Sequence, residues 1–252
     1  MSTASPSRPS FTDAVRAEEL PTSFTWHARD TIALLAIPAL FGANWLATRF
    51  TDDPAAITTA DAAMRIAIFA VLVVANASLL RRHWRAFRRA PWRSIGLVLA
   101  GMVVIQVVIT VLGSLLRPLV DGGSATADSS QSAQLATGVL LFASLAPTVT
   151  ALIEDFTFRH TLFLKLPVFS RRGVTVLVMV VNALVFGAIH LNNFGGELLL
   201  TLSYAGAGLV MNLVYLWTRN IWHVLLMHAL NNFILGGPVT VLLVLALQSL
   251  VG

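Results

Sequence analysis

Two adjacent carboxylates and an arginine follow an apolar stretch, where the sequence reads Ile-Glu-Asp-Phe-Thr-Phe-Arg-His over residues 153–160. On a helix, Asp155 and Arg159 are four residues apart and share a face, while Glu154 points about 100° away from them. Charges beside hydrocarbon are costly, at roughly 2.5–3.5 kcal/mol each near mid-membrane. These residues are therefore either interfacial residues at the end of a membrane helix or parts of a polar site within it.

Two later apolar segments carry polar side chains at helical spacing. Asn182, Phe186 and His190 recur every four residues in one segment, and His228 and Asn232 are four apart in another. A single histidine in a membrane helix is commonly a helix–helix hydrogen bond. Polar groups on three separate helices each add an insertion cost, so together they indicate a polar cavity.

The chemistry open to this set is hydrolysis without a covalent intermediate. Glu154 hydrogen-bonded to water would be a general base, and His190 could share that water. His228 and the Asn232 amide could donate hydrogen bonds to a developing oxyanion. Alternatively, Glu154, His190 and His228 could hold a divalent metal such as zinc, as three ligands with an open position. No His-Glu-x-x-His sequence supports the metal alternative, and both alternatives stay open.

Composition places these residues in a membrane protein. Of the 252 residues, 56% are hydrophobic and 12% charged, which gives more apolar surface than one soluble core can bury. The net charge is +5, but the arginines cluster between apolar runs, so we expect no nucleic-acid binding. The absence of cysteine excludes disulfides, thiolate ligands and a thiol nucleophile.

The order of apolar and polar segments predicts an all-α, polytopic bundle. Residues 1–28 are polar and lack the apolar core of a signal peptide, so we expect a flexible cytoplasmic tail followed by a transmembrane domain over 29–252. A polar stretch at 121–134 is expected to be a loop. We expect about eight transmembrane helices, near 31–48, 62–80, 94–116, from 135 into the acidic cluster, 174–190, 198–217, 221–235 and 239–251.

The distribution of basic residues orients the predicted helices. The tail together with Arg29 directly after it, the arginine- and tryptophan-rich stretch 81–93, residues 159–172 and Arg219 hold all but three of the seventeen basic residues. Positive residues favour the cytoplasmic side, so we expect 81–93 to be a cytoplasmic loop that lies on anionic headgroups. Both termini would then be cytoplasmic, in a multi-pass protein of the cell membrane.

The depth of the carboxylates adds a constraint. A helix rises about 1.5 Å per residue, so His190 would lie about 24 Å along a helix that begins at Val174. It could not meet Glu154 if the preceding helix ended at the acidic cluster. We therefore expect that helix to continue through the apolar residues 161–166, which puts Glu154 at mid-depth.

The polar positions resemble the three motifs of the CPBP family of intramembrane proteases. Over roughly residues 135–235 these motifs are, in order, Glu154-Asp155-x-x-x-Arg159, Phe186-x-x-x-His190 and His228-x-x-x-Asn232. The family includes the CAAX prenyl endoproteases and the bacterial Abi and bacteriocin-processing proteins. The resemblance implies that Glu154 and His190 activate water, and that His228 and Asn232 stabilise the oxyanion.

The resemblance also implies supporting residues. Arg159 matches the arginine that supports the helix of the catalytic glutamate, and Phe186 begins the second motif. The family usually has two adjacent glutamates, whereas this chain has Asp155 in the second position. The shorter side chain argues against a direct catalytic role for Asp155, although its pairing with Arg159 is retained. A metal mechanism and a metal-free glutamate mechanism have both been argued for the family.

These observations favour an intramembrane endopeptidase that cleaves a membrane-associated peptide or protein. Its partners would be membrane lipid and that substrate, and the sequence identifies no partner subunit. One alternative is a non-proteolytic scaffold or a bacteriocin-immunity-type protein that uses the same cavity to bind a partner. Another is a small-molecule or proton transporter, because intramembrane Glu, His and Asn also line such paths.

Overall fold

The computed structural model describes residues 11–120 and 135–251, and within these ranges the chain is helical with no β-strand. The predicted all-α architecture is confirmed, and the predicted loop at 121–134 lies outside the described residues. The helices are α1 (Ala28–Ala47), α2 (Pro54–Ala75), α3 (Ala77–Phe87), α4 (Pro91–Leu116), α5 (Thr137–Ala143), α6 (Ala146–Asp155), α7 (Arg172–Ala188), α8 (Thr201–Thr218), α9 (Ile221–Leu235) and α10 (Pro238–Val251). Shorter elements are the 3-10 turns η1 (Arg117–Leu119), η4 (Leu191–Phe194) and η5 (Leu198–Leu200), and the π-helix η3 (Phe156–Leu164).

Six stretches of the described chain are long and apolar enough to cross a membrane, and α7 is a shorter apolar helix. Their exposed surface is rich in Leu, Val and Ile side chains, which suits contact with lipid rather than water. The chain is therefore a polytopic helical bundle, as predicted. Local signals set some helix starts: the Asp53 carboxylate accepts a hydrogen bond from the Ala55 amide ahead of α2, and Asn220 caps α9 in the same way.

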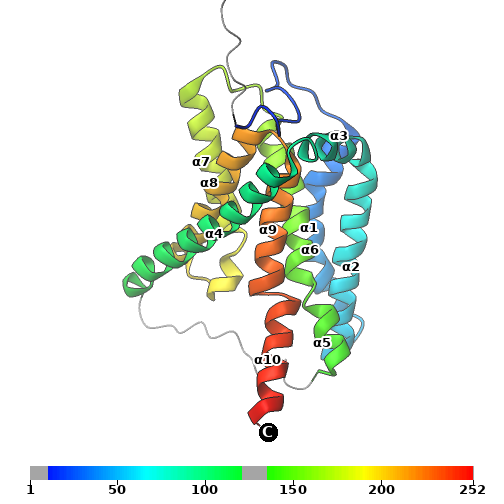
Figure 1. The fold of residues 1–252 in the computed structure, drawn as a ribbon. Helices are drawn as coiled ribbons and strands as arrows, with labels where there is room; N and C mark the ends of the chain where they lie inside the picture. Colours follow the sequence, from blue (N-terminus) through cyan, green and yellow to red (C-terminus); the bar gives the residue numbers. More distant parts are fainter. Residues whose placement is uncertain (1–10, 121–134, 252) are drawn as a thin grey trace, which may run out of the picture.

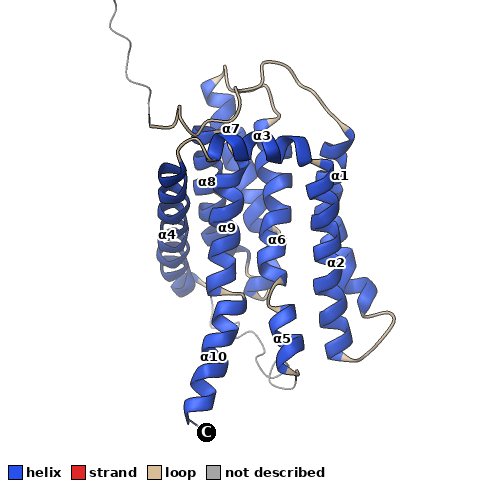
Figure 2. Ribbon diagram, turned by 45° about the vertical axis from the view of Figure 1, so that its right-hand side comes forward, coloured by secondary structure: helices blue, strands red, loops and turns tan. Residues whose placement is uncertain are grey.

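The bundle has one strongly basic end, across which α3 lies (Figure 1). We define the basic end as α3, the connection from η3 to α7 and the turn between α8 and α9, and the opposite end as the far end. The basic residues of the basic end include Arg81, Arg82, Arg85, Arg171, Arg172 and Arg219. Starting from it, α1, α4 and α7 run towards the far end, and α2, the stretch α5–α6–η3, and α8 return (Figure 2).

The C-terminal part of the predicted layout requires correction. The expected separate helices 221–235 and 239–251 form one continuous apolar stretch, Ile221–Leu250. Only Gly236 and Gly237 separate α9 from α10, and the Thr240 hydroxyl donates to the Ile234 carbonyl across this junction. As a result α10 continues in the direction of α9, and the C-terminal helix ends at the far end (Figure 1). The two ends of the described chain therefore lie at opposite ends of the bundle, contrary to the expected shared side.

The N-terminal segment also differs from the expected flexible tail, of which residues 1–10 lie outside the described residues. Residues 11–27 lie against the basic end, where Val15 is fully buried and its carbonyl accepts from the Asn220 amide. Glu18 lies 3.3 Å from His83, and Glu19 lies 2.6 Å from Arg219. A polar segment of this kind is held because its carboxylates meet the basic residues that the sequence concentrates at this end.

The expected cytoplasmic loop 81–93 is largely helical, because α3 extends to Phe87. This short helix is strongly amphipathic: Leu79, Leu80 and Phe87 are buried against the bundle while its arginines point outwards. Asn76 separates α3 from α2, and its side-chain amide donates to the Leu72 carbonyl. The change in direction at Asn76 lets α3 cover the end of the bundle.

The predicted continuation of the fourth membrane segment is confirmed. α5, α6 and η3 form one membrane-length stretch, Thr137–Leu164, with Glu154 well inside it. Beyond Asp155 the helix widens to a π-helix, closed by a bond from the Lys165 amide to the His160 carbonyl. A π-helix within a longer helix is commonly found at functional sites.

Two glycines let α7 and α8 approach closely and so position the end of α7. A methyl group built on Gly187 would lie 2.6 Å from the Thr201 carbonyl oxygen, and one on Gly208 would lie 2.8 Å from the Phe186 ring. A larger residue would have to displace the α8 backbone at position 187 or the Phe186 ring at position 208. The close packing fixes Phe186, and with it the start of the turn that carries His190.

Candidate active site

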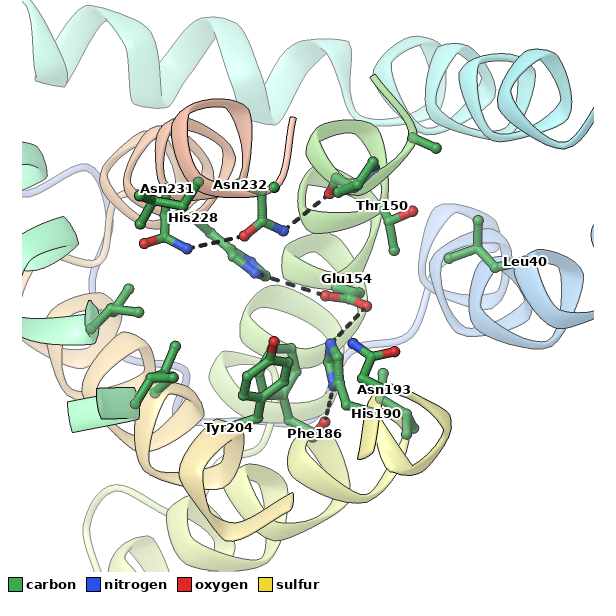
Figure 3. Close-up of a pocket in the computed structure, with 18 of the residues that line it drawn as sticks. Leu40, Thr150, Glu154, Phe186, His190, Asn193, Tyr204, His228, Asn231 and Asn232 are labelled. Carbon is green, nitrogen blue, oxygen red and sulfur yellow. Dashed lines mark hydrogen bonds and ion pairs between the residues drawn. The ribbon is translucent and has the colours of Figure 1, made fainter. Parts of the chain in front are cut away.

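A cavity of about 780 Å³ lies inside the bundle, and its walls come from α1, α2, α4, α6, α7, α8, α9 and η4. Glu154, His190, His228 and Asn232 all line it. Figure 3 shows Glu154 between the two imidazole rings, with Asn232 on the adjoining helix. The structure thus brings together the four side chains that the sequence singled out for chemistry, from three separate segments of the chain.

His190 faces the carboxylate of Glu154 through one ring nitrogen. Its Nε2 lies 3.6 Å from Glu154 Oε1. Its Nδ1 lies 2.8 Å from the Phe186 carbonyl oxygen, which only accepts hydrogen bonds, so Nδ1 carries the hydrogen. In the neutral ring the Nε2 lone pair therefore points towards Glu154, an arrangement that needs a proton donor or a cation between the two atoms.

His228 approaches Glu154 from α9. Its Nε2 lies 4.0 Å from Glu154 Oε2, and its Nδ1 lies 3.4 Å from Asp155 Oδ2. The two adjacent carboxylates of the first motif thus contact the two nitrogens of one ring. Asp155 lies on the buried side of the imidazole, beside Nδ1, while Glu154 lines the cavity together with His228.

The Asn232 amide is held by a chain of side-chain amides. Its Nδ2 donates to the Pro147 carbonyl at 3.1 Å, and its Oδ1 accepts from Asn231 at 3.1 Å. Asn231 in turn accepts from Gln106 on α4 at 2.7 Å. This chain joins α4, α9 and α6, so the orientation of Asn232 depends on the packing of three helices.

The ion pair expected between Asp155 and Arg159 is present and entirely buried. Arg159 Nε lies 3.3 Å from Asp155 Oδ1, and both side chains have no exposed surface. The guanidinium carbon lies 4.0 Å from the centroid of the Phe186 ring. Phe186 also meets the His190 ring, with centroids 4.9 Å apart. Arg159 therefore connects the helix of Glu154 to Phe186, whose carbonyl oxygen accepts the hydrogen bond from His190.

Several cavity residues were not anticipated from the sequence. Tyr204 packs edge-on against the His190 ring, with centroids 4.8 Å apart. Arg65 pairs with Asp61 at 2.7 Å and donates to the Thr150 hydroxyl at 2.7 Å. The sequence does contain a signal for the pair of Asp61 and Arg65, because an acid and a base four residues apart in an apolar helix share one face. The lone amide in the apolar segment 94–116, Gln106, is a comparable signal, whereas Tyr204 has no distinguishing pattern.

The residues around Glu154 have the composition of a three-ligand zinc site, with two imidazole nitrogens and one carboxylate. Donor atoms of a tetrahedral zinc site lie about 3.3 Å from one another. Here the two imidazole Nε2 atoms lie 3.6 and 4.0 Å from the carboxylate oxygens. Within the described residues no group of three His, Cys, Asp or Glu side chains is already drawn together at metal-site spacing. The donor types fit a metal, and the carboxylate would have to move slightly closer to both rings.

Comparison with known proteins identifies one family. Residues 136–234 match the family described as type II CAAX prenyl endopeptidase Rce1-like, which confirms the resemblance drawn from the three motifs. No curated protein and no solved structure matches the chain. The matched segment is less than half of the 252 residues but contains Glu154, His190, His228 and Asn232. The match supports a CAAX-type intramembrane protease as the general class of activity.

Proposed function

We propose that this chain is a membrane endopeptidase that hydrolyses a peptide bond in a membrane-associated peptide or protein. Glu154 and His190 activate the attacking water, and His228 and Asn232 stabilise the oxyanion. The observation that carries the proposal is the arrangement of two imidazole Nε2 atoms on either side of one glutamate, in a large cavity within a membrane bundle. The family match to residues 136–234 supports the same reaction class.

The water position follows from the distance between Glu154 and His190. Their facing atoms are 3.6 Å apart, slightly too far for a direct hydrogen bond. A water about 2.8 Å from both atoms fits to one side of the line that joins them, towards the cavity. Glu154 takes a proton from this water, and the hydroxide attacks the carbonyl carbon of the scissile bond.

The developing oxyanion then lies towards α9. Asn232 Nδ2 carries two hydrogens, of which one is used on the Pro147 carbonyl, and the other is free to donate. His228 donates from Nε2 in the form that carries a proton there, with Asp155 beside its Nδ1. When the carbon–nitrogen bond breaks, Glu154 returns the proton to the leaving amine, so protons balance over the reaction.

A metal would be held by Glu154, His190 and His228, whose donor types suit zinc. When bound, such an ion would supply Lewis-acid polarisation of the carbonyl and of water. The contributions of Asn232, Asp155 and Arg159 are the same in either case: a hydrogen-bond donor from α9, an orienting contact to His228, and a buried ion pair that fixes the helix of Glu154.

Glu154→Gln tests the proposal, because glutamine keeps the shape of the side chain and cannot act as a base. In proteoliposomes, hydrolysis of a susceptible peptide should fall by about 10²–10⁴-fold. Glu197→Gln is the matched control, because Glu197 is exposed and does not line the cavity. Thermal unfolding of both variants in detergent should match that of the unmodified chain.

Turnover retained by folded Glu154→Gln would refute the mechanism. A scaffold or immunity function predicts a different outcome, in which the cellular phenotype survives Glu154→Gln and is lost when bulky residues replace the small residues of α8. A transporter predicts proton-coupled uptake into liposomes that contain the purified chain.

A further inference from the structure

The cavity lies in the half of the bundle remote from the basic end. α2 and the stretch α5–α6–η3 both begin at the far end, and α2 and α6 supply Asp61 and Pro147 to the wall. α1 and α9 run towards the far end, where α9 is continued by α10, and their later turns supply Phe41 and Leu235. Glu154 therefore lies in the inner part of a cavity whose walls extend towards the far end.

The chain closes the cavity on the side of the basic end. Every residue from Ile153 to Thr161 is buried. The Thr157 hydroxyl donates to the Ala33 carbonyl on α1, and His160 Nδ1 bonds with the fully buried Tyr215 hydroxyl at 2.9 Å on α8. Residues 11–27 lie over the same end. No residue of α3 or of residues 11–27 lines the cavity.

The basic residues of the described chain indicate which end is cytoplasmic. Outside the basic end and the buried Arg159, the arginines that remain in the described chain towards the far end are Arg49, Arg65 and Arg117. Arg65 is paired with Asp61 inside the cavity wall. Clustered arginines beside membrane helices mark the cytoplasmic side, so the basic end faces the cytoplasm.

We infer that the active-site cavity opens towards the non-cytoplasmic side of the membrane, and that its substrate is a polypeptide segment displayed on that side next to a membrane anchor. The substrate part of the inference rests on the proposed function, whereas the position of the entrance does not. Apolar side chains from α1 and α4, among them Leu40, Phe41 and Ile105, line one part of the cavity, and amides line another. Such walls suit an extended segment with apolar side chains, and a prenylated C-terminus on the cytoplasmic side could not reach them.

The absence of native cysteine makes the position of the entrance directly measurable, because a single introduced thiol is the only labelling site. Asn192→Cys places that thiol at an exposed residue of the cavity wall. Asp52→Cys, in the exposed α1–α2 connection, marks the far end, and Arg88→Cys, directly after α3, marks the basic end. The probe is a membrane-impermeant maleimide, applied to intact cells and to inside-out vesicles.

Asn192→Cys and Asp52→Cys should react in intact cells, and Arg88→Cys only in inside-out vesicles. Reaction of Asn192→Cys only in inside-out vesicles, together with Arg88→Cys, would overturn the inference. Reaction of Arg88→Cys in intact cells would also overturn it, because the basic end would then be outside.

A second experiment separates the entrance from the enzymatic activity. A pool of impermeant quenched-fluorescence peptides with apolar residues is added to right-side-out or inside-out vesicles, with Glu154→Gln vesicles as the blank. Hydrolysis should occur only with right-side-out vesicles, and hydrolysis confined to inside-out vesicles would overturn the inference. Labelling of Asn192→Cys from outside without any hydrolysis would uphold the position of the entrance and count against the proteolytic function.

Discussion

The buried ion pair of Asp155 and Arg159 allows a quantitative test of how the site is held together. The Arg159 side chain has no exposed surface, and its Nε lies 3.3 Å from Asp155 Oδ1. Its guanidinium also lies over the Phe186 ring, and its Nη2 contacts the Met211 sulfur at 3.5 Å. The positive charge therefore has one carboxylate, one thioether and two aromatic rings as partners, and the Phe186 ring is nearer than that of Phe158.

The expected size of the effect follows from this geometry. With an effective dielectric constant of about 20, two unit charges at this separation attract by roughly 5 kcal/mol. Arg159→Met keeps most of the side-chain volume but leaves a buried carboxylate without its cation, which should destabilise the bundle by roughly 3–5 kcal/mol. Adding Asp155→Asn removes the unpaired charge, so the double variant should recover a large part of this loss. A coupling energy of roughly 2–4 kcal/mol is expected.

The assay is reversible unfolding in mixed micelles as the fraction of sodium dodecyl sulfate rises, followed by tryptophan fluorescence for all four members of the cycle. Arg49→Met is the matched control, because Arg49 is exposed and lies over the exposed Trp45 ring, where loss of the charge should cost less than about 1 kcal/mol. Additive effects of the two buried substitutions, within about 0.5 kcal/mol, would show that the pair does not hold the helix of Glu154.

Three further predictions follow from the structure. Asn232→Ala should lower kcat about 10²–10³-fold while the unfolding midpoint changes little, because it removes one of the two proposed oxyanion donors. An unchanged kcat in a peptide hydrolysis assay would remove Asn232 from the proposed mechanism. Gly187→Ala should destabilise the bundle by about 1–3 kcal/mol, because the added methyl group would meet the backbone of α8 at 2.6 Å. In the control Gly42→Ala the methyl group meets nothing within 4 Å, so this variant should be neutral or stabilising. Unfolding of both variants in mixed micelles measures the difference. Burial raises the pKa of Glu18, but the hydrogen bond and charge of His83 outweigh this effect, so the pKa of Glu18 in the folded chain lies below 4.5. The attachment of residues 11–27 should therefore be strong above pH 4.5 and weaken as the pH falls through the folded pKa. Hydrogen exchange of residues 11–27 should show this loss, and Glu18→Gln should abolish its pH dependence.

The convergence of the site residues could be predicted from the sequence, because the relevant rules are local. The spacing of four residues between Asp155 and Arg159, and between His228 and Asn232, fixes shared helix faces wherever the helices lie. The cost of polar groups in hydrocarbon then requires that they meet one another. The depth of Glu154 was also predictable, since a helix that ended at the acidic cluster could not have reached His190.

The parts that escaped prediction depend on contacts between distant segments. Residues 11–27 resemble a solvated tail, and the partners of Glu18 and Glu19 come from two other segments, α3 and the turn between α8 and α9. At the two glycines between α9 and α10 the chain continues in the same direction, with the Thr240 hydroxyl bonded to the Ile234 carbonyl, and hydropathy cannot distinguish this continuation from a reversal. Similarly, the amide chain from Gln106 to Asn232 joins residues more than a hundred positions apart.

The aspartate that replaces the second glutamate of the family motif fits the spacing of this bundle. Asp155 lies 3.3 Å from Arg159 on its own helix and 3.4 Å from His228 Nδ1 on α9, and its side chain is fully buried. A glutamate would carry its carboxylate about 1.5 Å farther, into groups that are already in contact, so α9 would have to move away from α6. Since α9 carries both His228 and Asn232, that movement would lengthen the distances from Glu154 to these two side chains. The shorter side chain therefore lets α6 and α9 approach closely enough for Glu154, His228 and Asn232 to share one cavity.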